Sequence, residues 1–218
     1  MIIVNITPTA LDDDGSQYQE VVINKPYHHG DLRAALLAAA ADLLDREGAE
    51  GVSLRAVARA VGVSQTAPYN HFDSKEALLV ALAAEGFSAL RRSQQQALAT
   101  LAAGSNALEA LGSNYVSFAT EKPQRYRLMF GLGLKDRSML AAVAKVKRAS
   151  FEPLHTVLRA RSVNLDPATL DAEAVAAWAF VHGLASLVID GSLRDDAAAG
   201  ATSLRVRRAI ATFAQNLG

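Results

Sequence analysis

Apolar residues recur at intervals of three and four residues along most of this 218-residue chain. Typical runs are Leu32, Leu36, Ala40 and Leu43, then Leu79, Leu82, Gly86, Phe87 and Leu90, and finally Val206, Ile210, Phe213 and Leu217. Such spacing places the side chains on one face of an α-helix, whereas a half-buried strand alternates at every second residue. Strand-like stretches occur only at residues 1–6 and 20–23. The pattern therefore predicts an all-α protein.

Composition supports the helical prediction and excludes several classes of protein. Alanine makes up about a fifth of the residues, which favours helix over strand. The chain contains no cysteine, so it can form no disulfide framework, thiolate zinc site or cysteine nucleophile. Half of the residues are hydrophobic and the formal net charge is zero, which is not the composition of a disordered chain.

The longest apolar stretch without a charged residue, residues 174–189, has 16 residues and contains His182. It is shorter than the roughly 18 to 20 residues that a membrane-spanning helix requires. The first basic residue is Lys25, so the N-terminus does not resemble a secretory signal. The sequence predicts a soluble cytoplasmic protein without a membrane partner.

An acidic run near the N-terminus, residues 12–14 followed by Gly15, superficially suggests a calcium loop. With Gly15 at the turn position of such a loop, the first and twelfth ligands would be Ala10 and Val21, which cannot coordinate the ion. The spacing H-E-x-x-H of zinc proteases does not occur either. We therefore predict neither a metal site nor a cofactor.

Breaks in the helical pattern divide the chain into three parts. Residues 1–25 lack helical periodicity and are interpreted as an N-terminal arm, whose role the sequence leaves open. Residues 26–75 contain three short helical segments with tight glycine turns, and residues 76–218 contain five or six longer ones. Pro153 should break one long helix, and Asp166-Pro167 should begin another. The prediction is a small N-terminal domain joined to a larger helical bundle.

The small domain has the features of a helix-turn-helix. Ser53 can cap a helix that ends at Gly62, where glycine readily takes the left-handed conformation. Ser64 can cap the next helix two residues later. Two helices joined by a short glycine turn can place the second helix in the major groove of DNA. We therefore expect residues 65–70 to form a recognition helix.

That recognition segment is short and polar. The amide side chains of Gln65 and Asn70 can pair with an adenine edge, and Thr66 can contact a base acceptor or a thymine methyl group. Pro68 lacks a backbone donor and should shorten or tighten the helix. Phe72 is apolar between polar neighbours, so we expect it to pack beneath the next helix.

A specific combination of residues surrounds this turn: Gly62-Val63-Ser64, Tyr69, His71, Phe72, Ser74-Lys75-Glu76, Leu78 and Leu79. Together with residues 27–33 upstream, they resemble the DNA-binding domain of the TetR family of bacterial transcriptional regulators. The resemblance implies a homodimer that binds a roughly palindromic operator, most often as a repressor. It also implies an unidentified small-molecule effector that binds the C-terminal domain and alters DNA binding.

The resemblance assigns roles to residues of the small domain. Positions matching Tyr69, His71 and Lys75 contact DNA phosphates in the family, and those matching Gln65, Thr66 and Asn70 face the bases. The remaining residues expected at the DNA are Ser53, Arg55 and Ser64. Arg55 and Arg59 could equally be a solvated helix face.

Two other classes of function remain open at this point. A helix-turn-helix used for protein contacts would show the same glycine turn, but it would not need Tyr69, His71 and Lys75 together. An all-α enzyme is the further alternative, although Gly131-Leu132-Gly133 stops short of a dinucleotide-binding fingerprint and no phosphate loop occurs. We predict no enzymatic activity, and salt-dependent DNA binding would distinguish the regulator from both alternatives.

The C-terminal domain carries one further signature. Trp178, His182 and Gly183 have the spacing W-x-x-x-H-G, which resembles the motif of the family's WHG subtype. The residues expected to line an effector pocket are Tyr115, Phe118, Tyr126, Met129, His155, Trp178 and His182. An ordinary core, in which His182 binds a neighbouring backbone group, is the alternative.

The helix expected over residues 168–190 is apolar on two sides and must be covered on both. One side can face its own domain and the other a second subunit, in a four-helix interface completed by the last helix. The residues expected at this interface are Phe180, Gly183, Leu184, Leu187, Val188, Ile210, Phe213 and Leu217.

The zero net charge argues at first against a nucleic-acid-binding protein. The charge is unevenly distributed, however: residues 53–75 carry three cationic side chains against one carboxylate, whereas residues 31–50 carry five carboxylates against two arginines. We therefore expect a small cationic DNA-binding surface, doubled by dimerisation, with weak affinity for non-specific DNA.

Overall fold

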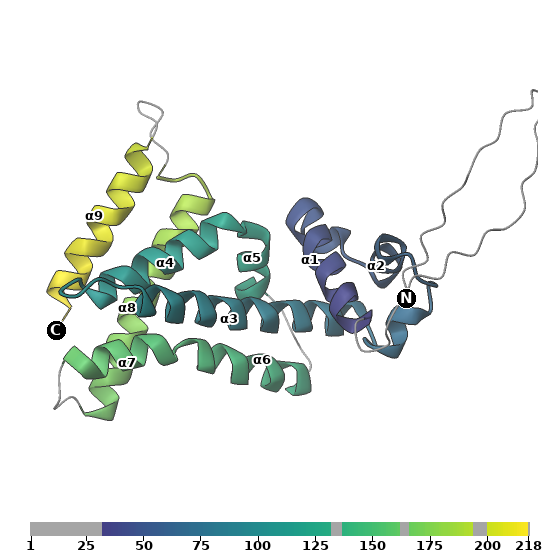
Figure 1. The fold of residues 1–218 in the computed structure, drawn as a ribbon, viewed down its shortest axis with the longest axis horizontal. Helices are drawn as coiled ribbons and strands as arrows, with labels where there is room; N and C mark the ends of the chain where they lie inside the picture. Colours follow the sequence, from purple (N-terminus) through teal and green to yellow (C-terminus); the bar gives the residue numbers. More distant parts are fainter. Residues whose placement is uncertain (1–31, 132–136, 162–165, 194–199, 218) are drawn as a thin grey trace, which may run out of the picture. The chain divides into compact units, whose positions relative to one another are not determined.

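The computed structural model describes residues 32–131, 137–161, 166–193 and 200–217. Contacts divide the chain into residues 1–32 and residues 33–218, and the description below concerns the second unit together with Leu32, the first residue of α1. Its elements (Figure 1) are α1 (Leu32–Gly51), α2 (Leu54–Val61), η1 (Ala67–Asn70), α3 (Lys75–Ala99), α4 (Ala107–Glu121), α5 (Pro123–Gly131), α6 (Arg137–Ser150), α7 (Glu152–Arg161), α8 (Pro167–Ile189) and α9 (Ala201–Asn216). The all-α prediction is confirmed. The expected N-terminal arm and both strand-like stretches lie outside the described residues.

Helix boundaries follow the local signals in the sequence. The side chain of Asp166 accepts hydrogen bonds from the backbone of Ala168 and Thr169, at 3.0 and 3.1 Å, at the start of α8. Near Pro153 the helical pattern is interrupted as expected, because α6 ends at Ser150 and α7 begins at Glu152.

Two expectations about the helices are wrong. From α3 to α9 the described residues form seven helices rather than five or six. The first helix is also not short: α1 spans 20 residues, of which 16 precede Gly48, where a φ of 73° kinks the helix. Glycine tolerates that conformation, so the helix resumes for three residues beyond it.

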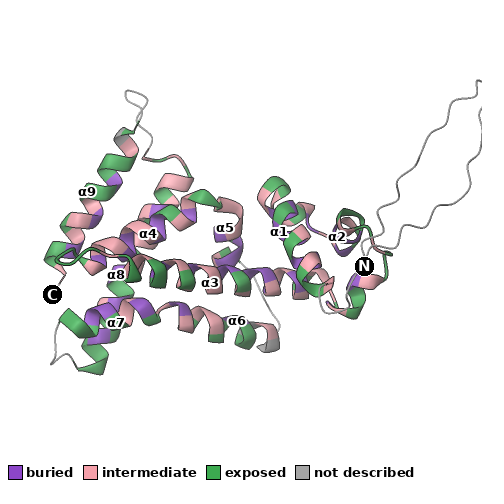
Figure 2. Cartoon of the chain, viewed as in Figure 1, coloured by how far each residue is buried: buried purple, intermediate pink, exposed green. Residues whose placement is uncertain are grey.

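The 25-residue helix α3 lies between α4 and α6 in Figure 1 and also contacts α5 and α7. Its buried residues include Leu82, Phe87 and Leu90, which are at most 3% exposed. Figure 2 shows buried stretches along this helix. Gly86 allows a close approach of α5, because a Cβ atom there would lie 2.7 Å from the sulfur of Met129. The helix therefore runs from the helix-turn-helix into the core of the larger domain.

Helix α8 is long and apolar enough, by length and composition alone, to cross a membrane. Here it packs instead against α4, α7 and α9. Its inner side is buried through small residues such as Ala174, Ala177 and Ala185. On its outer side, Val175 and Leu187 remain 51% and 45% exposed in the single chain. An apolar helix covered on only one side predicts a further contact surface.

Candidate DNA-binding surface and effector cavity

Helix α2, which precedes the recognition segment, is fixed at both ends by hydrogen bonds. The hydroxyl of Ser53 accepts a 3.1 Å hydrogen bond from the backbone of Ala56 and so caps α2. Gly62 takes the expected left-handed conformation, with φ of 77°, and its N–H donates to the carbonyls of Ala58 and Arg59. These contacts end α2 and direct the chain into the recognition segment.

The recognition segment is a single 3₁₀ turn, which begins later than the helix expected over residues 65–70. Backbone donors of Ala67 and Tyr69 bond to the carbonyls three residues earlier, at 3.1 Å each. The hydroxyl of Ser64 caps no helix; it lies 3.1 Å from the Thr66 hydroxyl. Pro68 is buried beneath the turn and supplies no backbone donor, which is the physical reason for the tight geometry.

Polar and aromatic side chains of this segment face solvent. Tyr69 is 51% exposed, and the other exposed positions are Ser64, Gln65, Thr66 and Asn70. Phe72 is only 4% exposed, as expected, and the guanidinium of Arg33 lies 5.2 Å from its ring centre. The buried Pro68 and Phe72 thus anchor a segment whose remaining side chains are free to contact a partner.

Cationic groups flank the segment on both sides. Arg55 and Arg59 on α2 are exposed. Lys75 is the first residue of α3, whose N-terminus is capped by the hydroxyl of Ser74 at 3.1 Å from the backbone of Ala77. Its ammonium donates a 3.3 Å hydrogen bond to the carbonyl of Glu50. A lysine beside free backbone donors at a helix N-terminus suits a phosphate.

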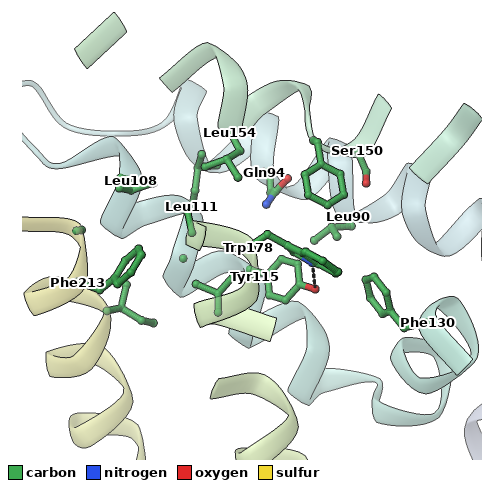
Figure 3. Close-up of a pocket in the computed structure, with 16 residues that line it drawn as sticks. Leu90, Gln94, Leu108, Leu111, Tyr115, Phe130, Ser150, Leu154, Trp178 and Phe213 are labelled. Atoms are coloured by element: carbon green, nitrogen blue, oxygen red, sulfur yellow. Dashed lines mark hydrogen bonds between the residues drawn. The ribbon is translucent and has the colours of Figure 1, made fainter. Parts of the chain in front are cut away.

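The larger domain encloses a cavity of about 40 Å³. Every helix from α3 to α9 contributes to its lining, which is apolar except for a few polar atoms. Figure 3 shows the side chains of Leu111, Gln94, Tyr115 and Trp178 around it. Gln94 is 6% exposed, and its Oε1 atom accepts no hydrogen bond within the described part of the chain. A buried acceptor without a partner is costly, so the cavity favours a molecule that can donate to it.

A chain of hydrogen bonds runs along one side of the cavity. The indole N–H of Trp178 donates to the hydroxyl of Tyr115 at 3.2 Å, and the Tyr115 and Tyr126 hydroxyl oxygens lie 3.3 Å apart. The Tyr126 hydroxyl lies 2.6 Å from Nδ1 of His182, which is also 3.1 Å from the Tyr115 hydroxyl. An indole can only donate and each hydroxyl carries one proton, so three of these four contacts can be hydrogen bonds at the same time. The protons then run from Trp178 to Tyr115, from Tyr115 to Tyr126, and from Tyr126 to Nδ1 of His182.

This arrangement requires a neutral imidazole. Burial lowers the pKa of His182, and the nearby charge of Lys147 lowers it further. Burial also raises the pKa of Tyr115 and of Tyr126, which keeps both hydroxyls protonated as donors. The group therefore joins α4, α5 and α8 without any net charge.

The residues expected in the effector pocket occupy three environments. Tyr115 and Trp178 line the cavity, and Tyr126 and His182 lie behind them in the hydrogen-bonded group. Phe118 and Met129 pack in the surrounding core. His155 lines a separate open groove between α6, α7 and α8.

The residues expected at a dimer interface also differ in their environment. Ile210 and Phe213 line the cavity; Ile210 is 2% exposed within the single chain, and Phe213 stacks on Phe180 with ring centres 4.3 Å apart. Gly183 and Leu187 are exposed on α8. The partly buried positions are Leu184, Val188 and Leu217.

Several lining residues were not predicted, chiefly Gln94, Phe130 and Phe151. Gln94 follows Leu90 by four residues and so continues an apolar helix face with a polar side chain. That break in the pattern is the one signal in the sequence that could have identified it.

One polar contact links α5 to α1. The guanidinium of Arg125 donates to the Asp45 carboxylate at 2.9 Å, and the ammonium of Lys122 contacts the same oxygen at 3.1 Å. About a quarter of the Arg125 and Asp45 side chains is exposed. Arg125 immediately precedes Tyr126, so the hydrogen-bonded group beside the cavity is one residue from the contact with α1.

A solvent-facing recognition turn held by a helix-turn-helix, followed by a helical domain with an internal cavity, defines a helix-turn-helix transcriptional regulator. Residues 36–82 match the family described as bacterial regulatory proteins, tetR family, and residues 108–213 match the tetracyclin repressor-like C-terminal domain. The chain belongs to the TetR family, whose members are DNA-binding regulators of transcription rather than enzymes.

Similar proteins agree with this assignment. A solved structure from Rhodococcus sp. RHA1, of unknown function, is 34% identical with a TM-score of 0.75 and covers 89% of this chain and 99% of its own. The Bacillus subtilis HTH-type transcriptional regulator YobS is 35% identical over 88 residues, which are 40% of this chain and only 46% of YobS. AibR, solved with isovaleryl coenzyme A and operator DNA, shares the fold at 17% identity and a TM-score of 0.58, covering 83% of this chain and 97% of its own.

Proposed function

We propose that this protein is a homodimeric repressor that binds a roughly palindromic operator in the bacterial cytoplasm and is released by a small-molecule effector. Residues 26–75 form the DNA-binding domain, and residues 76–218 bind the effector and dimerise. The observation that carries the proposal is the exposed recognition turn, which is anchored by Pro68 and Phe72 and flanked by cationic side chains.

At the DNA, Tyr69, His71 and Lys75 contact phosphates, while Gln65, Thr66 and Asn70 face base edges. The phosphate contacts position the protein on the duplex, and the base contacts select the sequence. Ser53, Arg55 and Ser64 complete the surface. Exposure of the base-facing side chains supports this division.

The second subunit covers the outer side of α8 together with α9. Val175, Leu187 and Leu204 are each at least 44% exposed in the single chain, and large apolar side chains on neighbouring helices favour burial by a partner. A dimer also places two recognition turns on one duplex, which matches a palindromic site.

The effector site is the cavity beside Trp178 and Tyr115. At about 40 Å³ it is far smaller than the roughly 300 to 1,000 Å³ of typical ligand pockets, so an effector must separate the surrounding helices. A ligand that fits only the opened state prefers that state, which is the condition for a shift in population. The contact of Arg125 with Asp45 offers a route from the cavity to α1.

Acyl coenzyme A thioesters are the first effector class to test, because AibR binds one together with operator DNA. The W-x-x-x-H-G spacing further favours the WHG subtype for the C-terminal domain. In this structure Trp178 and His182 belong to one hydrogen-bonded group, so the spacing has a structural role here.

Fluorescence anisotropy with labelled DNA from upstream of the protein's own gene tests the proposal. We expect saturable binding that weakens steeply with salt and that stops when Tyr69 and Lys75 are both changed to alanine. A protein that binds no such DNA at low salt is not an operator-binding regulator. Sedimentation of the same samples measures the expected dimer.

A further inference from the structure

Lys147 on α6 lies at the edge of the effector cavity. Its ammonium is 5.5 Å from the ring centre of Phe130 and 5.5 Å from that of Trp178, and both rings line the cavity. The side chain is partly buried, so its charge has lost some of its water. The two aromatic faces stabilise a cation by their quadrupoles but do not neutralise it.

No carboxylate neutralises this lysine among the described residues. The ion pairs found there use Arg46, Arg91, Lys122, Arg125 and Arg127 as their cations. On the cavity side the nearby titratable groups are His182, whose pKa the charge of Lys147 lowers, and the Tyr115 and Tyr126 hydroxyls, which are bonded to His182. On the groove side they are Lys145, Arg148, Glu152, His155 and Asp171, and in the described part of the chain no ion pair joins either carboxylate to Lys147. A partly desolvated charge without a counter-ion favours an anion at this position.

The space next to Lys147 can accept such an anion. Lys147 lines an open groove of about 610 Å³ together with Lys145 and Arg148. Phe151 lines both this groove and the inner cavity, so the two spaces share a wall. The cavity side is largely apolar and holds the unpartnered Gln94 oxygen, whereas the groove side carries three cationic side chains against the carboxylates of Glu152 and Asp171.

We infer that the effector is an amphipathic anion, with its apolar part in the cavity and a carboxylate or phosphate paired with Lys147. This inference rests on the proposed function for its biological meaning, but the binding itself is independent of DNA. A carboxylate and a phosphate are both anions that can pair with the Lys147 ammonium. The size of the groove also leaves room for a larger head group such as a nucleotide.

Trp178 is the only tryptophan of the chain, so its fluorescence reports the site directly. We would titrate the full-length protein with decanoate, decyl phosphate, decanoyl coenzyme A and the neutral decanol. At least one of the anions should bind about tenfold or more tightly than decanol. The anion with the lowest Kd identifies the head group.

Variants test the role of Lys147. K147Q should abolish the preference for anions over decanol, and K147R should retain it. Arg159→Gln is the control, since Arg159 is an exposed cation on α7 that lines neither the cavity nor the groove, and it should change the Kd less than about twofold. Thermal unfolding of each variant establishes that it is folded.

The inference is overturned if decanol binds as tightly as every anion, or if K147Q keeps the full preference for the anion. The same samples are assayed with labelled DNA. If DNA binds while no anion is preferred, the inference fails and the proposed function stands. If anions bind through Lys147 but no DNA does, the inference on the ligand stands and the proposed function fails.

Discussion

Arg125 on α5 donates a 2.9 Å hydrogen bond to the carboxylate of Asp45 on α1, across 80 positions of sequence. The remaining atoms are less well satisfied: Asp45 Oδ1 and Arg125 Nε are buried without a hydrogen-bond partner among the described residues. The Arg125–Asp45 pair therefore positions α5 against α1, but its unpaired buried atoms reduce its contribution to the stability of the fold. A contact of this kind can break and re-form when α5 moves.

Asp45→Asn should loosen the attachment of α1 to α5. We expect a loss of about 1 kcal/mol in the free energy of unfolding, because a charge-assisted bond that is about three-quarters buried is weakened. Amide hydrogen exchange should become faster in α1 but not in α8. The control is Asp190→Asn, which removes the more exposed contact of Asp190 with Arg127, also 2.9 Å long. Equal effects of the two variants would show that the Asp45 contact has no special role.

Lys75→Ala should weaken binding to all DNA sequences alike, because an ammonium on a phosphate carries no sequence information. The dependence of log K on log salt should become shallower by about one unit. Anisotropy titrations at several salt concentrations measure both quantities. Lys145→Ala on α6 serves as control, and an unchanged slope for Lys75→Ala would remove this residue from the phosphate contacts.

Gln65→Ala should instead relax the preference at one operator position by about 1 to 3 kcal/mol, since an amide can pair with both groups of an adenine edge. Competition with a set of single-base operator variants measures this preference. If the variant lost affinity equally for every operator, Gln65 would not contact a base.

The neutral state of His182 predicts a dependence of stability on pH. Burial lowers the folded-state pKa below the ordinary 6.5, so the unfolded chain binds the proton more readily. This stabilisation should be complete above about pH 6.5 and should decrease as the pH falls towards the folded-state pKa. Urea unfolding at several pH values, compared between the wild type and His182→Gln, should show a shallower decrease in the variant. His155→Gln is the control, and an identical pH profile in all three proteins would contradict the assignment.

Gly62→Ala should cost about 1 to 2 kcal/mol in the free energy of unfolding, because φ is 77° and an L side chain disfavours that conformation. An added Cβ would meet no atom within 4 Å, so the cost is conformational and not steric. Gly131→Ala, which also adds a Cβ in open space but at a φ outside the left-handed region, should change stability by less than about 0.5 kcal/mol. Similar losses in both variants would argue against a conformational origin.

Local features of this protein could be predicted from the sequence because their causes lie within a few residues. Ser53 caps α2 through a donor three residues away, and Gly62 ends the helix through its own φ. Asp166 and Pro167 begin α8 for the same kind of reason. The tight geometry of the recognition segment was predictable from Pro68. The absence of the expected Ser64 cap was not predictable from the sequence.

The cavity and its charges were decided by the tertiary structure. Trp178 bonds to Tyr115 across 63 positions, and Gln94 and Phe130 join them in the cavity lining from two further helices. Helical periodicity states which face of a helix is apolar, but it does not state which other face will cover it. The sequence alone therefore determined the all-α fold and the helix-turn-helix. Packing between distant helices determined which buried polar groups were left without partners, and hence where we propose that an effector binds.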